Sequence, residues 1–194
     1  MIKTTNMLLE ELNTYASPNN KIGRMVQAKE LVPIVKGLYE TDSSTPGYLL
    51  AGSIYGPSYL SFDFALGIHG LIPEAVYAFT SATFEKKKKK QYDTPFGLFT
   101  YQDVPTQVFY LGVQVKEEGN YAYYIASPEK ALCDKLYSVK PVRNRKELEE
   151  LLFDDLRIDE TEFLRMNKND IMELAEVYHS TNVTLLAQYV RRCF

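Results

Sequence analysis

The sequence predicts an α+β fold in which a small N-terminal module precedes an antiparallel sheet and a set of C-terminal helices. Three observations support this prediction. Apolar and polar residues alternate with a period of two along most of residues 75–126. Apolar residues recur at spacings of three and four from residue 127 onward. The first 40 residues contain two helical patterns followed by a short stretch of β-prone residues.

Composition is that of an ordinary folded protein. Of 194 residues, 45% are hydrophobic and 24% charged, and the formal net charge is −3, which argues against disorder and against a globally basic nucleic-acid binder. No apolar stretch approaches the ~20 residues of a membrane span. Cys133 and Cys193 are too few and too far apart for a disulfide framework or a zinc site. We therefore expect a cytoplasmic protein with no membrane contact, no metal and no small-molecule cofactor.

The N-terminal module is expected to consist of two helices and a hairpin. Residues 3–15 place Leu8, Leu12 and Tyr15 on one helix face, and Ser17-Pro18 is a start signal for a second helix over 18–28. Strand-forming stretches follow at 31–35 and 38–40, with a turn at Lys36-Gly37.

This order of elements is typical of a reduced N-terminal winged-helix-like module, which we predict for residues 1–42. The turn-rich segment DSSTPG, residues 42–47, is the predicted linker to a second domain over 48–194. Between the two predicted helices no residues remain for the middle helix of a complete winged-helix domain.

The second domain is expected to begin at 48–55 with either a strand or a buried helix, followed by a short helix over 62–69. Short polar connections favour an antiparallel meander for the strands that follow. The predicted strands are 75–84, 96–103, 107–115 and 121–126. The predicted helices begin at Ser127-Pro128 and continue at 145–153, 160–166, 168–178 and 182–192.

One face of the 18–28 helix is a candidate DNA-contacting surface. A winged helix places a helix in the major groove, where Lys and Arg bind phosphates and Arg or Gln can reach base edges. The candidate DNA-binding residues are Lys21, Arg24, Gln27, Lys29 and Lys36. The alternative is a solvated face on a small docking module, since residues 1–48 carry no net charge.

Two further groups of cations could contact phosphates. One is the run of five lysines, Lys86 to Lys90, which could equally be a solvated loop that discourages edge-to-edge aggregation. The other lies in the basic stretch 130–146, which an acidic stretch follows directly. The candidates there are Lys140, Arg143, Arg145 and Lys146.

Little in the sequence points to catalysis. No nucleophile elbow, zinc-protease, P-loop or dinucleotide motif is present. Asp63, His69 and Glu74 form the only polar group in the apolar centre of the chain, and we name no catalytic residue. Tyr121, Tyr123 and Tyr124 could stack on bases, but packing is the simpler explanation for tyrosines in a strand.

Four segments in order along the chain carry a family resemblance. They are ELVPIVKGLYE, PSYLSFDFALGIHGLIPE, TPFGLFTYQDVP with FYLG after it, and IASPEKALCDKLY. In these segments, which span roughly residues 30–140, the chain resembles the AbiEi family of antitoxins from bacterial type IV toxin–antitoxin (abortive infection) systems.

The resemblance implies a cytoplasmic bacterial protein associated with phage defence. It implies an N-terminal winged helix that binds the promoter DNA of its own operon and represses it. It also implies an antitoxin domain that counteracts a nucleotidyltransferase-type toxin without forming a stable complex with it. Two alternatives remain: a DNA-binding transcriptional regulator without antitoxin activity, and an enzyme that acts on nucleotides through Asp63, His69 or Glu74.

Overall fold

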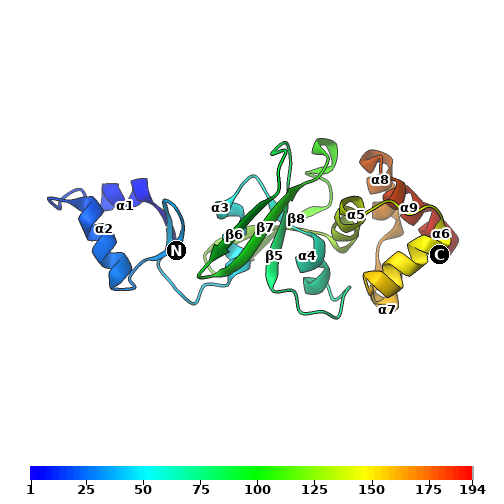
Figure 1. The fold of residues 1–194 in the computed structure, drawn as a ribbon, viewed down its shortest axis with the longest axis horizontal. Helices are drawn as coiled ribbons and strands as arrows, with labels where there is room; N and C mark the ends of the chain where they lie inside the picture. The colour runs from blue at the N-terminus through cyan, green and yellow to red at the C-terminus, as the bar shows by residue number, and fades with distance from the viewer. Residues whose placement is uncertain (194) are drawn as a thin grey trace.

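The first 40 residues form a small module at one end of an elongated molecule. The computed structural model describes residues 1–193, and the module lies at the left of Figure 1. Its strands pair antiparallel in the order β1-β3-β2. In chain order its elements are β1 (Ile2–Thr4), α1 (Thr5–Glu11), α2 (Pro18–Gln27), β2 (Val32–Val35) and β3 (Leu38–Glu40). The predicted second helix and hairpin are thereby confirmed.

The start of the module departs from the predicted helix over 3–15. Residues 2–4 form a strand instead, with Ile2 opposite Glu40 and Thr4 opposite Leu38, and the helix begins only at Thr5. Without β1 the edge of β3 would have unpaired backbone groups, and β-branched residues such as Ile and Thr are suited to fill it. Thr4 also caps the helix, because its Oγ1 accepts a hydrogen bond from the backbone N of Met7 at 3.2 Å.

The three-stranded sheet of the module packs on both faces, because strand side chains alternate between them. Toward the helices, Leu8, Ile22 and Leu31 form a small core of their own, against which Tyr39 packs. On the other face Ile34 belongs to the large core of residues 47–193, which we call the body. The module thus has a separate core and is also docked onto the body.

Glu40, at the end of β3, joins the module to the body and is fully buried. Its Oε2 accepts a hydrogen bond from the Tyr121 hydroxyl at 2.8 Å, and its Oε1 accepts from the backbone N of Thr41 and Asp42 and from the amino group of Met1. Burial alone would raise the pKa of Glu40. The hydrogen bonds from Met1, Tyr121 and the Asp42 backbone, together with the positive charge of the Met1 amino group, outweigh burial and lower that pKa.

The body is built on a six-stranded sheet in the order β6-β7-β5-β4-β9-β8, so the predicted α+β class is confirmed. Its strands are β4 (Tyr59–Leu60), β5 (Ala78–Thr83), β6 (Lys90–Thr94), β7 (Gly97–Asp103), β8 (Val113–Glu118) and β9 (Tyr121–Ala126). The neighbours β6/β7, β4/β5 and β8/β9 are antiparallel.

The strands do not follow the expected meander, because β5 pairs with β7 and β4 with β9 in parallel. The chain leaves β5 through the lysine-rich loop, forms β6, and returns as β7 between the two. The Asp103 carboxylate at the end of β7 joins this strand to the end of β5 and to the lysine-rich loop. It accepts hydrogen bonds from Thr83 Oγ1 and from the backbone N of Lys87, both at 2.7 Å.

The predicted strand over 107–115 is also wrong in its first half. Thr106–Val108 form a 3₁₀ turn (η2), and the strand starts only at Val113. Val108 and Phe109 are buried, and the Phe109 ring packs against Tyr59 at 5.1 Å between centroids. Packing of these two side chains requires a turn that places neighbouring residues inward, which an alternating strand cannot do.

Helices cover both faces of the body's sheet (Figure 1). The segment predicted over 48–55 as either a strand or a buried helix is helical as far as Ile54. A 3₁₀ turn η1 (Gly47–Leu50) continues into α3 (Ala51–Ile54) on one face, where the Ala51 carbonyl accepts a hydrogen bond from the Tyr101 hydroxyl. The predicted helices α4 (Phe62–Ile68) and α5 (Pro128–Ser138) lie on the other face. The Ser127 side chain caps α5 by accepting from the backbone N of Lys130.

The C-terminal helices form the opposite end of the molecule from the module (Figure 1). They match the predicted order closely, and Asn167 is an N-cap as its residue type suggests. They are α6 (Arg145–Glu149) with a π-helical continuation η3 (Glu150–Asp155), α7 (Glu160–Arg165), α8 (Lys168–Tyr178) and α9 (Thr181–Cys193).

One buried carboxylate, Asp134 on α5, connects the sheet with the C-terminal helices. Its Oδ2 accepts hydrogen bonds from Tyr59 at 2.9 Å and Ser61 at 2.6 Å. Its Oδ1 accepts from Lys130 at 2.9 Å and from the Tyr178 hydroxyl of α8. Burial, and then the charge of Asp134, raise the pKa of Tyr59 and Tyr178 well above 10.0, so both phenols remain protonated donors.

Asp134→Leu should lower the free energy of unfolding by about 3–5 kcal/mol, because it leaves the Lys130 ammonium buried without its counter-charge. Urea denaturation measures this loss. The matched control is the double variant Lys130→Met/Asp134→Leu, which removes both charges and should recover more than half of the loss. Equal destabilisation of the single and the double variant would contradict the pairing.

Glu40 should make stability depend on acid. Because its folded-state pKa lies below the ordinary value of 4.5, its contribution is present above pH 4.5 and is lost as the pH falls through the lowered pKa. Melting temperatures between pH 7 and pH 3 should therefore fall less steeply for Glu40→Gln than for the unmodified chain. Glu10→Gln, at an exposed position of α1, is the control and should leave the pH dependence unchanged.

Candidate functional site

The exposed face of α2 carries three of the predicted DNA-binding residues. Ile22 is buried in the small core of the module, so the opposite side of the helix faces solvent. Arg24 and Gln27 are exposed on that side, and Lys21 lies at its flank, with its Nζ 5.7 Å from the centroid of the Tyr15 ring. α1 and α2 lie on the far side of the module from the body (Figure 1), so nothing in the body covers this face.

Lys29 and Lys36 are also exposed, each in a turn that orients it. The backbone N of Lys29 donates to Val26 O at 3.1 Å and that of Glu30 to Met25 O at 2.9 Å, which is the hydrogen-bond pattern of a Schellman helix end. Lys29 therefore has φ 59°, a left-handed value that non-glycine residues rarely adopt. Lys36 lies in the β2–β3 turn beside Gly37, whose φ of 85° the turn requires.

Asn20 also belongs to this surface, although it is not among the residues predicted from the sequence. It is exposed and lies four positions before Arg24 and seven before Gln27, so the three share one helix face. That spacing was visible in the sequence and could have identified it. An asparagine side chain offers both a donor and an acceptor, which suits contact with a base edge or a phosphate.

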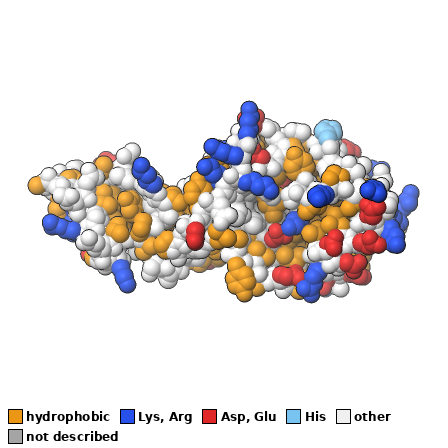
Figure 2. Space-filling view, viewed as in Figure 1, with side chains coloured by type: hydrophobic (Ala, Val, Ile, Leu, Met, Phe, Trp, Pro, Cys, Tyr) orange, Lys and Arg blue, Asp and Glu red, His pale blue; other side chains and the backbone are white. Residues whose placement is uncertain are grey.

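The lysine run is divided among several roles. Lys86 Nζ donates to Gly56 O at 3.0 Å and lies 5.2 Å from the centroid of the Tyr55 ring, so it is held against the protein. Lys87, Lys88 and Lys89 are exposed, and Lys90 begins β6. Figure 2 shows Lys and Arg side chains gathered over the upper middle of the molecule, above β6 and β7, and acidic side chains gathered toward the C-terminal helices.

The basic stretch 130–146 is largely paired with carboxylates. Its two cations on α5, Lys130 and Lys135, pair with Asp134 and Asp63. On α6, Arg145 pairs with Glu149 at 3.0 Å and Lys146 with Glu150 at 3.7 Å, while Lys140 and Arg143 are exposed between the two helices. The excess of positive charge counted along the sequence is therefore much reduced at the surface.

The three residues considered for catalysis are held by separate partners. Asp63 pairs with Lys135, and Glu74 with Arg157. His69 lies at the end of α4, and its Nε2 is 2.7 Å from the carbonyl oxygen of Ala126 at the end of β9. Cys133 is fully buried, and burial raises the pKa of its thiol, which disfavours a nucleophilic role. Among the residues that the structure describes, no group of His, Cys, Asp and Glu side chains could hold a metal ion.

The strand tyrosines already have partners in the protein. Tyr121 donates to Glu40, and the Tyr123 ring packs edge-on against Tyr48 at 5.4 Å between centroids. Tyr124 is 54% exposed on the opposite face of β9. Packing therefore accounts for the first two rings.

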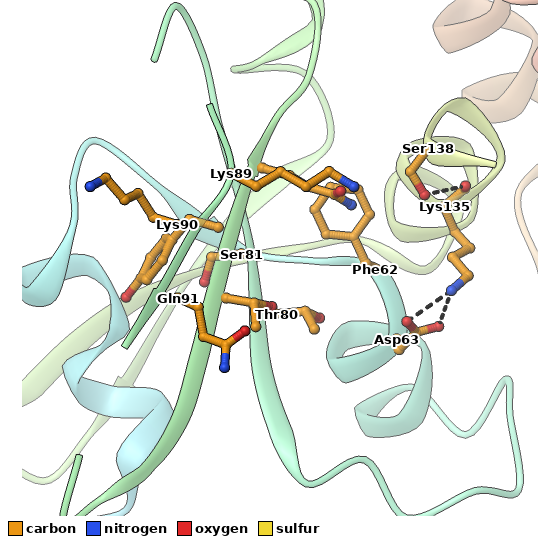
Figure 3. Close-up of a pocket in the computed structure, with 12 residues that line it drawn as sticks. Phe62, Asp63, Thr80, Ser81, Lys89, Lys90, Gln91, Lys135 and Ser138 are labelled. Atoms are coloured by element: carbon orange, nitrogen blue, oxygen red, sulfur yellow. Dashed lines mark hydrogen bonds and ion pairs between the residues drawn. The ribbon is translucent and has the colours of Figure 1, made fainter. Parts of the chain in front are cut away.

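A polar cavity of about 450 Å³ lies between the sheet and the helices α4 and α5 (Figure 3). Strands β5, β6 and β7 form one wall, with Thr80, Gln91 and Gln102 among its residues. Lys135 and Ser138 of α5 and Asp63 of α4 form the other. No motif in the sequence pointed to this cavity, because its lining residues are up to 76 positions apart, from Phe62 to Ser138.

Comparison with known proteins leaves the family resemblance as an inference from motifs. No protein-family model matches the chain, and no curated protein matches its sequence. Within residues 1–193, none of the helices combines the length and the apolar character needed to cross a membrane.

Proposed function

We propose that the chain is a DNA-binding antitoxin of a bacterial type IV toxin–antitoxin system. In this proposal the N-terminal module binds promoter DNA of its own operon and represses it, and the body counteracts a nucleotidyltransferase-type toxin. The DNA-binding part rests on the arrangement of the module. The antitoxin part rests on the four ordered segments that resemble AbiEi proteins.

The observation that carries the DNA-binding part is the combination of topology and exposure. Two helices connect β1 to a β2–β3 hairpin, the sheet order is β1-β3-β2, and the second helix presents its polar face outward. A helix of this kind can enter a major groove while the hairpin turn with Lys36 lies along the phosphate backbone. Arg24 and Gln27 would contact bases, and Lys21 and Lys29 would contact phosphates.

Removing two cations from α2 should weaken binding to the DNA upstream of the gene. Lys21→Ala/Arg24→Ala removes one phosphate contact and one base contact, so it should lower affinity at least tenfold. It should reduce the slope of log K against log salt by about one, because about 0.9 of slope is lost per phosphate contact. A mobility shift at several salt concentrations measures both. Lys116→Ala/Arg165→Ala removes the same charge from exposed sites on the body and should change neither. Unchanged binding by the α2 variant would contradict the assignment.

Co-expression tests the antitoxin part. The chain should restore growth to cells that express the nucleotidyltransferase-type toxin encoded beside it. The Lys21→Ala/Arg24→Ala variant should restore growth equally well but lose repression of a promoter reporter, because the two activities are assigned to different parts of the chain. Promoter repression without any rescue of growth would instead indicate a DNA-binding regulator that lacks antitoxin activity.

A further inference from the structure

The polar cavity of the body has two lysines on opposite walls. Lys135 projects from α5 and pairs with Asp63, with Nζ–O distances of 2.6 and 2.8 Å. Lys89 comes from the loop before β6 and extends across the cavity toward Phe62 and α5 (Figure 3). Lys90 also lines the cavity, but its side chain points the other way in Figure 3. Lys89 and Lys135 against the one carboxylate of Asp63 give the cavity an excess of positive charge.

The sheet wall between these lysines offers hydrogen-bonding groups that the protein does not use. Gln91, Thr100 and Gln102 line the cavity. Within residues 1–193 their side chains make no hydrogen bond to other protein groups, whereas Thr80 Oγ1 is engaged with Ser61 O and with the backbone N of Phe64. Amide and hydroxyl groups arranged in this way can bind the hydroxyls or ring nitrogens of a polar ligand.

Two other features distinguish this cavity from a chance surface hollow. Its volume of about 450 Å³ is within the range of small-molecule sites and exceeds what a phosphate ion alone requires. Phe62 on its wall has φ 54°, a left-handed value that is strained for a residue with a side chain, and such strain concentrates at functional sites.

We propose that this cavity binds a phosphomonoester of a polar, hydroxyl-bearing small molecule, with its phosphate between Lys89 and Lys135. A phosphate carries close to two negative charges at neutral pH, and lysine is a common phosphate ligand. The organic part lies along Gln91, Thr100 and Gln102. Asp63 both positions Lys135 and repels the phosphate, so it limits affinity. The site uses residues of the body alone and is independent of DNA binding by α2.

The simpler explanation is that the lysines only keep the edge strand β6 soluble. This explanation applies equally to Lys88 and Lys89, since both are exposed in the same loop. It assigns no function to Lys135 or Asp63. Lys88 does not line the cavity. The two explanations therefore differ in which lysine matters and in the effect of Asp63.

Calorimetric titration of the full chain with ribose 5-phosphate, adenosine 5′-monophosphate and inorganic phosphate tests the proposal. Both esters should bind at least threefold more tightly than inorganic phosphate. If the nucleotide binds more tightly than the sugar phosphate, the natural ligand is a nucleoside phosphate. If the two bind equally, it is a sugar phosphate. Absence of binding by both esters at millimolar concentration, or equal affinity for inorganic phosphate, would overturn the proposal.

Four variants locate the site. Lys89→Met and Lys135→Met should each weaken ester binding about tenfold, and Lys88→Met, the matched control, by less than twofold. Asp63→Asn should strengthen binding about threefold, which a purely structural role for Asp63 would not produce. Lys89 is exposed, so its variant keeps the test valid even if Lys135→Met disturbs folding. Equal losses for Lys88→Met and Lys89→Met, or weaker binding by Asp63→Asn, would contradict the assignment.

Discussion

The body of this protein depends on the buried carboxylate of Asp134. Asp134 accepts hydrogen bonds from four side chains: Tyr59 of β4, Ser61 directly after β4, Lys130 of α5 and Tyr178 of α8. It thereby connects the sheet to the C-terminal helices. A buried charge is tolerated only when it is paired and fully hydrogen-bonded, so the relative positions of these elements are constrained together. Tyr59 and Ser61 belong to one of the four segments on which the proposed family assignment rests, and Lys130 and Asp134 to another. At these positions, the residues of the two segments have a structural role, because they form the hydrogen bonds around Asp134.

Glu40 has a comparable role on a smaller scale. It lies where β3 ends, and its carboxylate binds the backbone of the linker and the hydroxyl of Tyr121 in the body. Together with Ile34 in the large core, this contact docks the module through one face of its sheet. The helices must then lie on the other face, which leaves the polar side of α2 accessible. The proposed DNA-binding surface is therefore a consequence of how the module is attached.

Charge along the sequence is a poor guide to charge at the surface of this protein. The basic stretch near residues 130–146 suggests a cationic patch, yet Lys135 pairs with Asp63 and Arg145 with Glu149. The lysine run suggests a uniform solvated loop, yet Lys86 is held against Tyr55 while Lys89 extends over a cavity. Arg145 and Glu149 are four positions apart on one helix, whereas the partners of Lys86 and Lys135 come from distant segments.

Features of this fold that depend on neighbouring residues can be predicted from the amino-acid sequence. The α+β class and the helices α2, α5 and α8 follow from periodicity, from Pro18 at the start of α2, and from the caps Ser127 and Asn167 of α5 and α8. The β2–β3 hairpin follows from a turn glycine, and all these signals act within a few residues. Three other features depend on contacts between distant segments: residues 2–4 form a strand, β7 lies between β5 and β6, and Lys89 and Lys135 lie on opposite walls of one cavity. Each of these outcomes depends on which strand edge is left open and which wall packs opposite, and contacts between distant segments are specified by the whole fold.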